Sequence, residues 1–320
     1  MREGVFVRKN IDKWKKFQHE PATTPDALAH QFTELVNDLG YARTFYPHSR
    51  VTRYLNGLAA QTYLGIYKNK REQGSRFLLF WKTELPLIVY QYRKELLYSL
   101  IIFTTFCLMG VFSSLQDHSF IRSILGDRYV EMTEDNIAKG DPFGVYNHEG
   151  KLEMFLTIAL NNIKVSFMVF VGGFLASVGT IWMLFNNGLM LGSFQTFFFL
   201  KDLGMQSVLV IWIHGTLEIS AIVIAGGAGL IVGNSILFPG TYSRLHSVKK
   251  GTRDGLKVMA GLVPVFIAAA FLEGFITRYS TMPRGISVSI LLISLVFILW
   301  YFVFYPKAVH RKLLQNKMPD

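Results

Sequence analysis

Residues 207–233, SVLVIWIHGTLEISAIVIAGGAGLIVG, form an apolar segment of membrane-spanning length that still contains a histidine and a glutamate. At a rise of about 1.5 Å per residue this helix would be about 40 Å long, against a hydrocarbon core of about 30 Å. His214 and Glu218 are one helical turn apart, on one face. A charge at that depth costs roughly 2.5–3.5 kcal/mol on insertion scales. The pair is therefore predicted to face other helices or a water-filled cavity and to have partners there.

The composition is that of a multi-pass, all-α membrane protein. Hydrophobic residues make up 51% of the chain and charged residues 17%, and the mean hydropathy is +0.30. Cys107 is the only cysteine, so the sequence has neither a disulfide framework nor a cysteine metal site. The net charge of +11 is not accompanied by a nucleic-acid recognition motif, and no nucleic acid is expected. We interpret the basic residues as a topology signal whose natural partner is the anionic lipid of the bilayer.

Three parts are predicted along the chain. Residues 1–94 contain no spanning segment, and their apolar residues recur at helical spacing, which indicates a helical cytoplasmic or interfacial domain. Residues 95–306 are predicted to form the transmembrane domain, and residues 307–320 a basic cytoplasmic tail.

Charge in the connecting loops predicts six spans. The loop 116–153 is mainly acidic and the loop 242–257 mainly basic, so the positive-inside rule places the first outside and the second in the cytoplasm. This arrangement requires the short apolar run 188–200 to cross the membrane. The protein is then expected in the inner (cytoplasmic) membrane of the cell, with both termini in the cytoplasm. The predicted spans are residues 96–115, 165–184, 188–200, 207–233, 256–277 and 286–305.

Polar side chains at membrane depth are the candidate functional residues. Each is interpreted either as an interhelical hydrogen-bonding group that locks helix packing or as part of a shared polar cavity. We hypothesise that His214, Glu218 and Glu273, with Asn187 nearby, line one polar site inside the bundle. The full set is Asn161, Asn162, Asn186, Asn187, His214, Glu218 and Glu273.

Small residues on the predicted spans indicate close helix packing. Glycine allows two backbones to approach, so at least one glycine face is expected to pack within the bundle, and a homodimer interface is the alternative use of such a face. The positions concerned are Gly172, Gly173, Gly188, Gly215, Gly226 and Gly227.

The sequence gives little support for catalysis. His214, Glu218 and Glu273 would supply three zinc ligands, but there is no HExxH motif and no second buried histidine. Neither a GxSxG nucleophile motif nor a phosphate-binding or dinucleotide-binding glycine loop is present. We therefore expect no catalytic residue, no metal and no cofactor, and any dependence on ATP would come from a partner.

An ordered series of motifs resembles the stage II sporulation protein M family of integral membrane proteins, in its longer form with a cytoplasmic N-terminal domain. The series covers about residues 96–305 and consists of Asn-Asn, Asn-Gly, His-Gly-x-x-Glu and Glu-Gly-Phe-Ile-Thr. Arg278 stands where the family usually has proline after the threonine. The polar and glycine positions of the family fall on Asn161, Asn162, Asn187, Gly188, His214, Gly215, Glu218, Glu273 and Thr277.

The resemblance implies a role in the cell envelope. The sporulation member of the family is the membrane scaffold of peptidoglycan-degrading partners, and longer relatives are typically encoded beside a MoxR-type ATPase and other membrane proteins. We therefore expect a non-enzymatic membrane component of a peptidoglycan-remodelling type of complex. The alternatives are a transporter or channel subunit that uses the polar site as a permeation path, and an intramembrane metalloenzyme.

Overall fold

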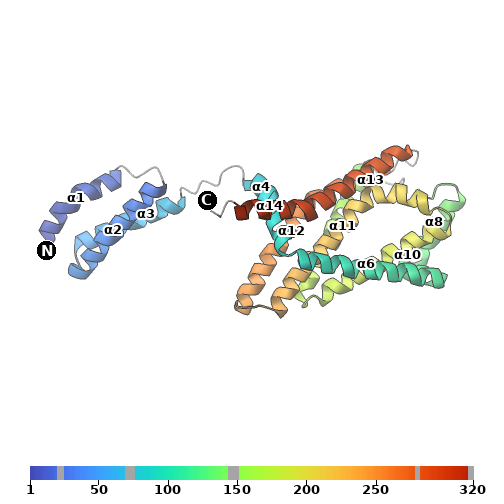
Figure 1. The fold of residues 1–320 in the computed structure, drawn as a ribbon, viewed down its shortest axis with the longest axis horizontal. Coiled ribbons are helices and arrows are strands. Elements are labelled where there is room, and N and C mark those ends of the chain that lie inside the picture. Colours follow the sequence, from blue (N-terminus) through green and yellow to red (C-terminus); the bar gives the residue numbers. More distant parts are fainter. Residues whose placement is uncertain (20–24, 69–75, 143–150, 278–281, 316–320) are drawn as a thin grey trace. The chain divides into compact units, whose positions relative to one another are not determined.

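The computed structural model describes residues 1–19, 25–68, 76–142, 151–277 and 282–315 (Figure 1). Throughout these ranges every regular element is a helix, which confirms the all-α prediction. The chain divides into two compact units, Met1–Phe77 and Leu78–Asp320, which are described separately.

The first unit consists of α1 (Glu3–His19), α2 (Pro25–Phe45) and α3 (Arg50–Lys68). Its core forms around Trp14, which is fully buried together with Leu35 and Leu55. The Trp14 indole Nε1 donates a hydrogen bond of 2.8 Å to Asp38 Oδ2. Apolar side chains from all three helices thus form a core that belongs to this unit alone.

The second unit contains the long apolar helices, with short α-helical, 3₁₀ and π-helical segments between them. Its elements are α4 (Arg76–Leu79), η1 (Phe80–Glu84), α5 (Leu85–Gln91), α6 (Arg93–Gln116), α7 (His118–Leu125), α8 (Asp127–Ala138), α9 (Lys151–Val171), η3 (Gly172–Phe174), α10 (Val178–Leu200), α11 (Gly204–Leu237), α12 (Arg244–Phe271), η4 (Leu272–Thr277), α13 (Arg284–Leu299), η5 (Trp300–Phe304) and α14 (Tyr305–Gln315).

Five helices in the described part of the chain are long and apolar enough to cross a membrane, which makes this a multi-pass membrane protein. A further long helix of this unit, α10, has 23 residues and is not among the five; Asn186, Asn187 and Gln195 interrupt its apolar sequence. The five candidate spans are Arg93–Gln116, Phe155–Phe174, Gly204–Leu237, Arg244–Thr277 and Arg284–Gln315.

The expectation of one continuous span over residues 165–184 is wrong. Helix α9 ends at Val171, and a tight turn reverses the chain before α10 begins at Val178. Ala176 and Ser177 in this turn have φ angles of 51° and 71°, in the left-handed region. The sequence is apolar on both sides of the turn, so hydropathy alone gave no boundary. The run 188–200 is accordingly the second half of a full-length helix.

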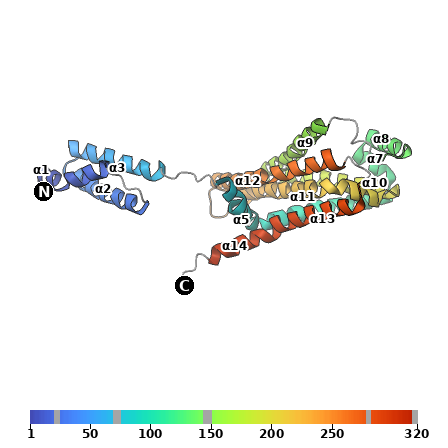
Figure 2. The same cartoon turned by 90° about the horizontal axis from the view of Figure 1, so that it is seen from above.

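Helix α11 is the central helix of the membrane unit. It contacts α6, α9, α10, α12 and α13, and residues 221–233 are all buried (Figures 1 and 2). The Gly229 carbonyl of α11 occupies the space that a side chain at Gly173 would need. Such backbone contacts explain why small residues are concentrated here, because lipid provides no hydrophobic drive for helices to associate.

Further backbone contacts join α10 to α6. A Cβ atom at Gly188 would lie 2.9 Å from the Phe103 carbonyl oxygen, and one at Gly110 would lie 2.7 Å from the Leu189 carbonyl oxygen. Gly226 and Gly227 of α11 lie against side chains of α6, the Ser99 hydroxyl and the Leu96 side chain. These glycines therefore lie against neighbouring helices within the bundle. Gly215 differs, since the space beside it is open within 4 Å.

The acidic and basic loops lie at opposite ends of the membrane unit. At one end α7 and α8 pack on the end of α10, where Lys201 Nζ lies 2.7 Å from Glu134 Oε1 and lowers the pKa of that carboxyl. At the other end the Tyr92 hydroxyl donates to Asp254 Oδ2 at 2.9 Å. The Tyr301 hydroxyl donates to the Trp81 carbonyl oxygen at 2.8 Å at this same end.

These two ends should lie on opposite sides of the membrane. In a cysteine-free background (Cys107→Ser), a single cysteine at Asn136 should react with an impermeant thiol reagent from outside intact cells, and one at Thr252 should react only after the membrane is opened. Labelling of both positions from one side would contradict the six-span arrangement.

A methyl group at Gly173 should break the contact between η3 and α11. We expect Gly173→Ala to destabilise the detergent-purified protein by about 3 kcal/mol or more, because the Gly229 backbone cannot move aside as a flexible side chain can. Gly285→Ala is the matched control, since nothing lies within 4 Å of that position. Equal melting temperatures for the two variants would refute the contact between Gly173 and Gly229.

Candidate functional site

His214 lies about three turns into α11 and is 4% exposed. Its ring Nδ1 is 3.1 Å from the Thr277 hydroxyl oxygen, and that hydroxyl itself donates to the Leu272 carbonyl at 3.2 Å. A threonine hydroxyl has only one proton to donate. Its oxygen therefore accepts from His214, so the proton of a neutral ring is on Nδ1 and the Nε2 lone pair is directed elsewhere.

Glu273 lies beside that second ring nitrogen. One carboxylate oxygen is 3.8 Å from His214 Nε2, and the Glu273 side chain is 12% exposed. This distance is too long for a direct hydrogen bond. The gap is of a size that a bound proton or cation would close with a small movement of the carboxylate.

Glu273 and Thr277 both lie in the π-helical segment η4, which continues α12. The wider π turn changes the direction of the side chains that follow, and single π turns occur often at functional sites. In η4 it directs both Glu273 and Thr277 toward His214 on α11.

Glu218 and Asn162 complete the group. The ligand atoms of His214, Glu218 and Glu273 all lie within 4.8 Å of one another. The Asn162 amide, from α9, interacts with the Glu218 carboxylate, and Asn162 is 5% exposed. Side chains from α9, α11 and η4 thus meet in one buried polar cluster, which we define as Asn162, His214, Glu218, Glu273 and Thr277.

The other asparagines at membrane depth make different contacts. Asn186 donates to the Trp182 carbonyl and Asn187 to the Met183 carbonyl, both at 2.8 Å and both one turn back along α10. Asn161 is exposed on the surface of α9. The sequence grouped these asparagines with the cluster because all of them are predicted to lie at membrane depth. Which face of its helix each asparagine occupies decides whether it belongs to the polar cluster.

Sequence reasoning missed several interhelical hydrogen bonds, among them three that join α11 to α6 and α10. Gln195 Nε2 donates to Ser207 Oγ at 2.7 Å, and Trp212 Nε1 donates to Gln195 Oε1 at 2.9 Å, which joins α10 to α11. Ser99 Oγ donates to the Val223 carbonyl at 2.6 Å and joins α6 to α11. The sequence signal for the first two bonds was Gln195, a polar residue inside the predicted span 188–200.

The cluster has the donor set of a divalent transition-metal site. One imidazole nitrogen and two carboxylates are ligands that Zn²⁺ and Mn²⁺ accept. The hydrogen bond from His214 Nδ1 to Thr277 also fixes the ring as an outer partner does in metal sites. The ligand atoms of His214, Glu218 and Glu273 lie up to 4.8 Å apart. In a tetrahedral zinc site the ligand atoms are about 2.1 Å from the ion and therefore about 3.4 Å from one another. Holding zinc would require the carboxylates to move inward by about an ångström.

These features define a multi-pass α-helical membrane protein with ionisable side chains at the centre of its bundle. The family model of stage II sporulation protein M matches residues 99–278. This match covers more than half of the chain and includes the whole polar cluster, so the chain belongs to that family. A second model, a domain of unknown function (DUF8413), matches residues 4–68 in the first unit. Neither a curated protein nor a solved structure matches the chain.

Removal of the Thr277 hydroxyl should destabilise the bundle. Thr277→Val keeps the shape but leaves His214 Nδ1 without this acceptor, at a cost of about 1–3 kcal/mol. Thr277→Ser keeps the hydroxyl and should be close to wild type. The measurement is thermal unfolding of the purified protein in detergent, and equal melting temperatures for the two variants would show that this bond contributes nothing.

Proposed function

We propose that this chain is a non-enzymatic membrane component of a cell-envelope complex, of the kind that remodels peptidoglycan. The observation that carries the proposal is the polar cluster, in which side chains of α9, α11 and η4 are partners of one another inside the bundle. Such a cluster holds three helices in register at the point where lipid offers no partners. Membership of the family supports the envelope role.

In this proposal the protein lies in the inner membrane with six spans and cytoplasmic termini. The order of the long helices supports it, because α6, α9, α10, α11, α12 and α13 alternate in direction when each crosses once. Helix α10 is the sixth span, and its amide side chains are tolerated because they bond to its own backbone or to α11.

The first unit is proposed as the docking module for a cytoplasmic partner. It has its own core around Trp14, and a separate family model matches it. Other membrane proteins and a MoxR-type ATPase are the proposed partners, and an ATPase would supply the nucleotide chemistry for which this chain has no motif.

A second candidate function is that of a transporter or channel subunit. The specific observation in its favour is that two carboxylates and an imidazole, side chains that bind protons and cations, meet inside the bundle. Ionisable residues at this depth often mark ion pathways. The same three side chains would also carry the metalloenzyme alternative.

Co-purification tests the envelope role. Full-length tagged protein from mildly cross-linked native membranes should retain other membrane proteins or an ATPase. Trp14→Ala should release the cytoplasmic partner, because the loss of a buried tryptophan costs about 3–5 kcal/mol and the first unit has only a small core. Val36→Ala, at an exposed position of the same unit, should retain it. A wild-type chain that purifies alone would refute the proposal.

Substitution of Glu218 separates the two candidate functions. If the cluster is structural, Glu218→Gln should support normal envelope growth in cells, because an amide can replace a carboxyl in a hydrogen-bonded pair, while Glu218→Leu should lower the amount of protein. If the cluster carries protons or cations, Glu218→Gln should abolish function with normal stability, because only the carboxyl changes charge. Metal analysis of the purified wild-type protein tests the metalloenzyme alternative in the same preparation.

A further inference from the structure

A groove of about 800 Å³ lies along the membrane unit, away from the polar cluster. Helix α6 forms one wall, α13 with η5 forms the other, and α11 forms the floor. Along most of its length the lining is aliphatic and aromatic, as at Leu100, Phe103, Ile219 and Leu299. An apolar surface of this kind inside a bilayer is suited to an acyl chain.

One end of the groove is basic. Arg93 and Lys94 from the start of α6 and Lys307 from α14 line this end, and no acidic residue is among the lining residues in the described part of the chain. None of the three basic side chains forms an ion pair within the described ranges. Three cations without a protein counter-charge make this end a site for a negative group.

The basic end has a defined shape. Arg93 Nη1 donates to the Tyr90 carbonyl at 2.9 Å, and the guanidinium carbon lies 4.6 Å from the centre of the Tyr90 ring. The same ring stacks on His310 of α14 with centroids 4.1 Å apart. These contacts join the beginning of α6 to α14, so the cations of the two walls are held at the same end of the groove.

The length of the groove matches one leaflet. Along α6 it extends from Arg93 to Leu108, about 22 Å at about 1.5 Å per residue. Half of a bilayer, including its polar headgroup region, is about 20–22 Å thick. An acyl chain lying against α6 would therefore place its phosphate at Arg93, Lys94 and Lys307.

We infer that this groove is a binding site for an anionic glycerophospholipid, with the acyl chains between α6 and α13 and the phosphate at the basic end. The charge pattern also argues against a second copy of the chain in the groove. Two copies in one membrane have the same orientation, so a pair packed groove to groove would bring Arg93, Lys94 and Lys307 of both chains together.

The test compares bound lipids on the intact, full-length protein. Detergent-purified protein is incubated with equal amounts of phosphatidylglycerol and phosphatidylcholine, and lipid adducts are counted by native mass spectrometry. A basic residue beside an anionic lipid changes its affinity about five-fold. We expect retention of phosphatidylglycerol at least about five-fold above phosphatidylcholine, and near-equal retention of the two in the variant Arg93→Gln, Lys94→Gln, Lys307→Gln.

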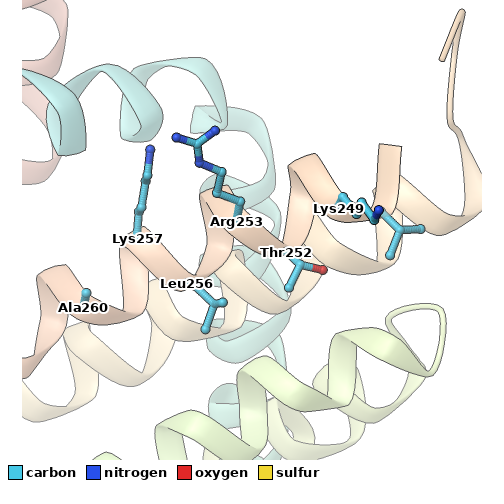
Figure 3. A pocket seen from close by; sticks show the side chains of 7 residues that line it. Lys249, Thr252, Arg253, Leu256, Lys257 and Ala260 are labelled. Carbon is cyan, nitrogen blue, oxygen red and sulfur yellow. The ribbon is translucent and has the colours of Figure 1, made fainter. Parts of the chain in front are cut away.

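The matched control is Lys249→Gln with Arg253→Gln, which removes charge from the face of α12 shown in Figure 3 and should keep the preference. A photoreactive group at the acyl end of phosphatidylglycerol should cross-link near Cys107 and Trp212, at the far end of the groove. Equal retention of both lipids by the wild type, loss of preference in the control, or a dimer mass that excludes lipid would each overturn the proposal.

Discussion

Helix packing in this membrane unit depends on close approach of α11 to the backbones around it. Within hydrocarbon there is no hydrophobic gain from bringing two apolar helices together, so contact area and hydrogen bonds must hold the bundle. Gly173 and Gly229 provide contact area between backbones. The Ser99 hydroxyl provides a hydrogen bond, which it donates to the Val223 carbonyl. The close backbone contacts between α6 and α10 at Gly110 and Gly188 follow the same rule.

The polar cluster is one result of this packing. His214 and Glu218 on α11 meet Asn162 and Glu273 only because α9 and α12 lie close enough on either side. The π-helical turn η4 then brings Thr277 to His214 Nδ1 and assigns the tautomer of the ring. Side chains that would each be costly alone in lipid are thus partners of one another. One nitrogen of the His214 ring remains directed at the Glu273 carboxylate.

The two ends of the bundle differ in chemistry. Amphipathic helices α7 and α8 cover the end that carries the acidic loop, and aromatic hydroxyls from Tyr92 and Tyr301 join the helices at the basic end. The lipid groove opens on the basic end, where an anionic leaflet would present its phosphates. The proposed envelope role and the proposed lipid site are compatible, since the groove and the cluster use different faces of α11.

The sequence by itself determined that the chain is helical and multi-pass, because long apolar runs and helical periodicity are local properties. It also predicted that His214, Glu218 and Glu273 share a site, because their cost in lipid requires partners. The turn at residues 172–177 was missed, since hydropathy is continuous through it. Only the tertiary structure separated Asn162 from Asn187 and joined Thr277 to His214. Spacing places side chains on one face of a helix, but which neighbouring helix that face meets depends on how the helices pack.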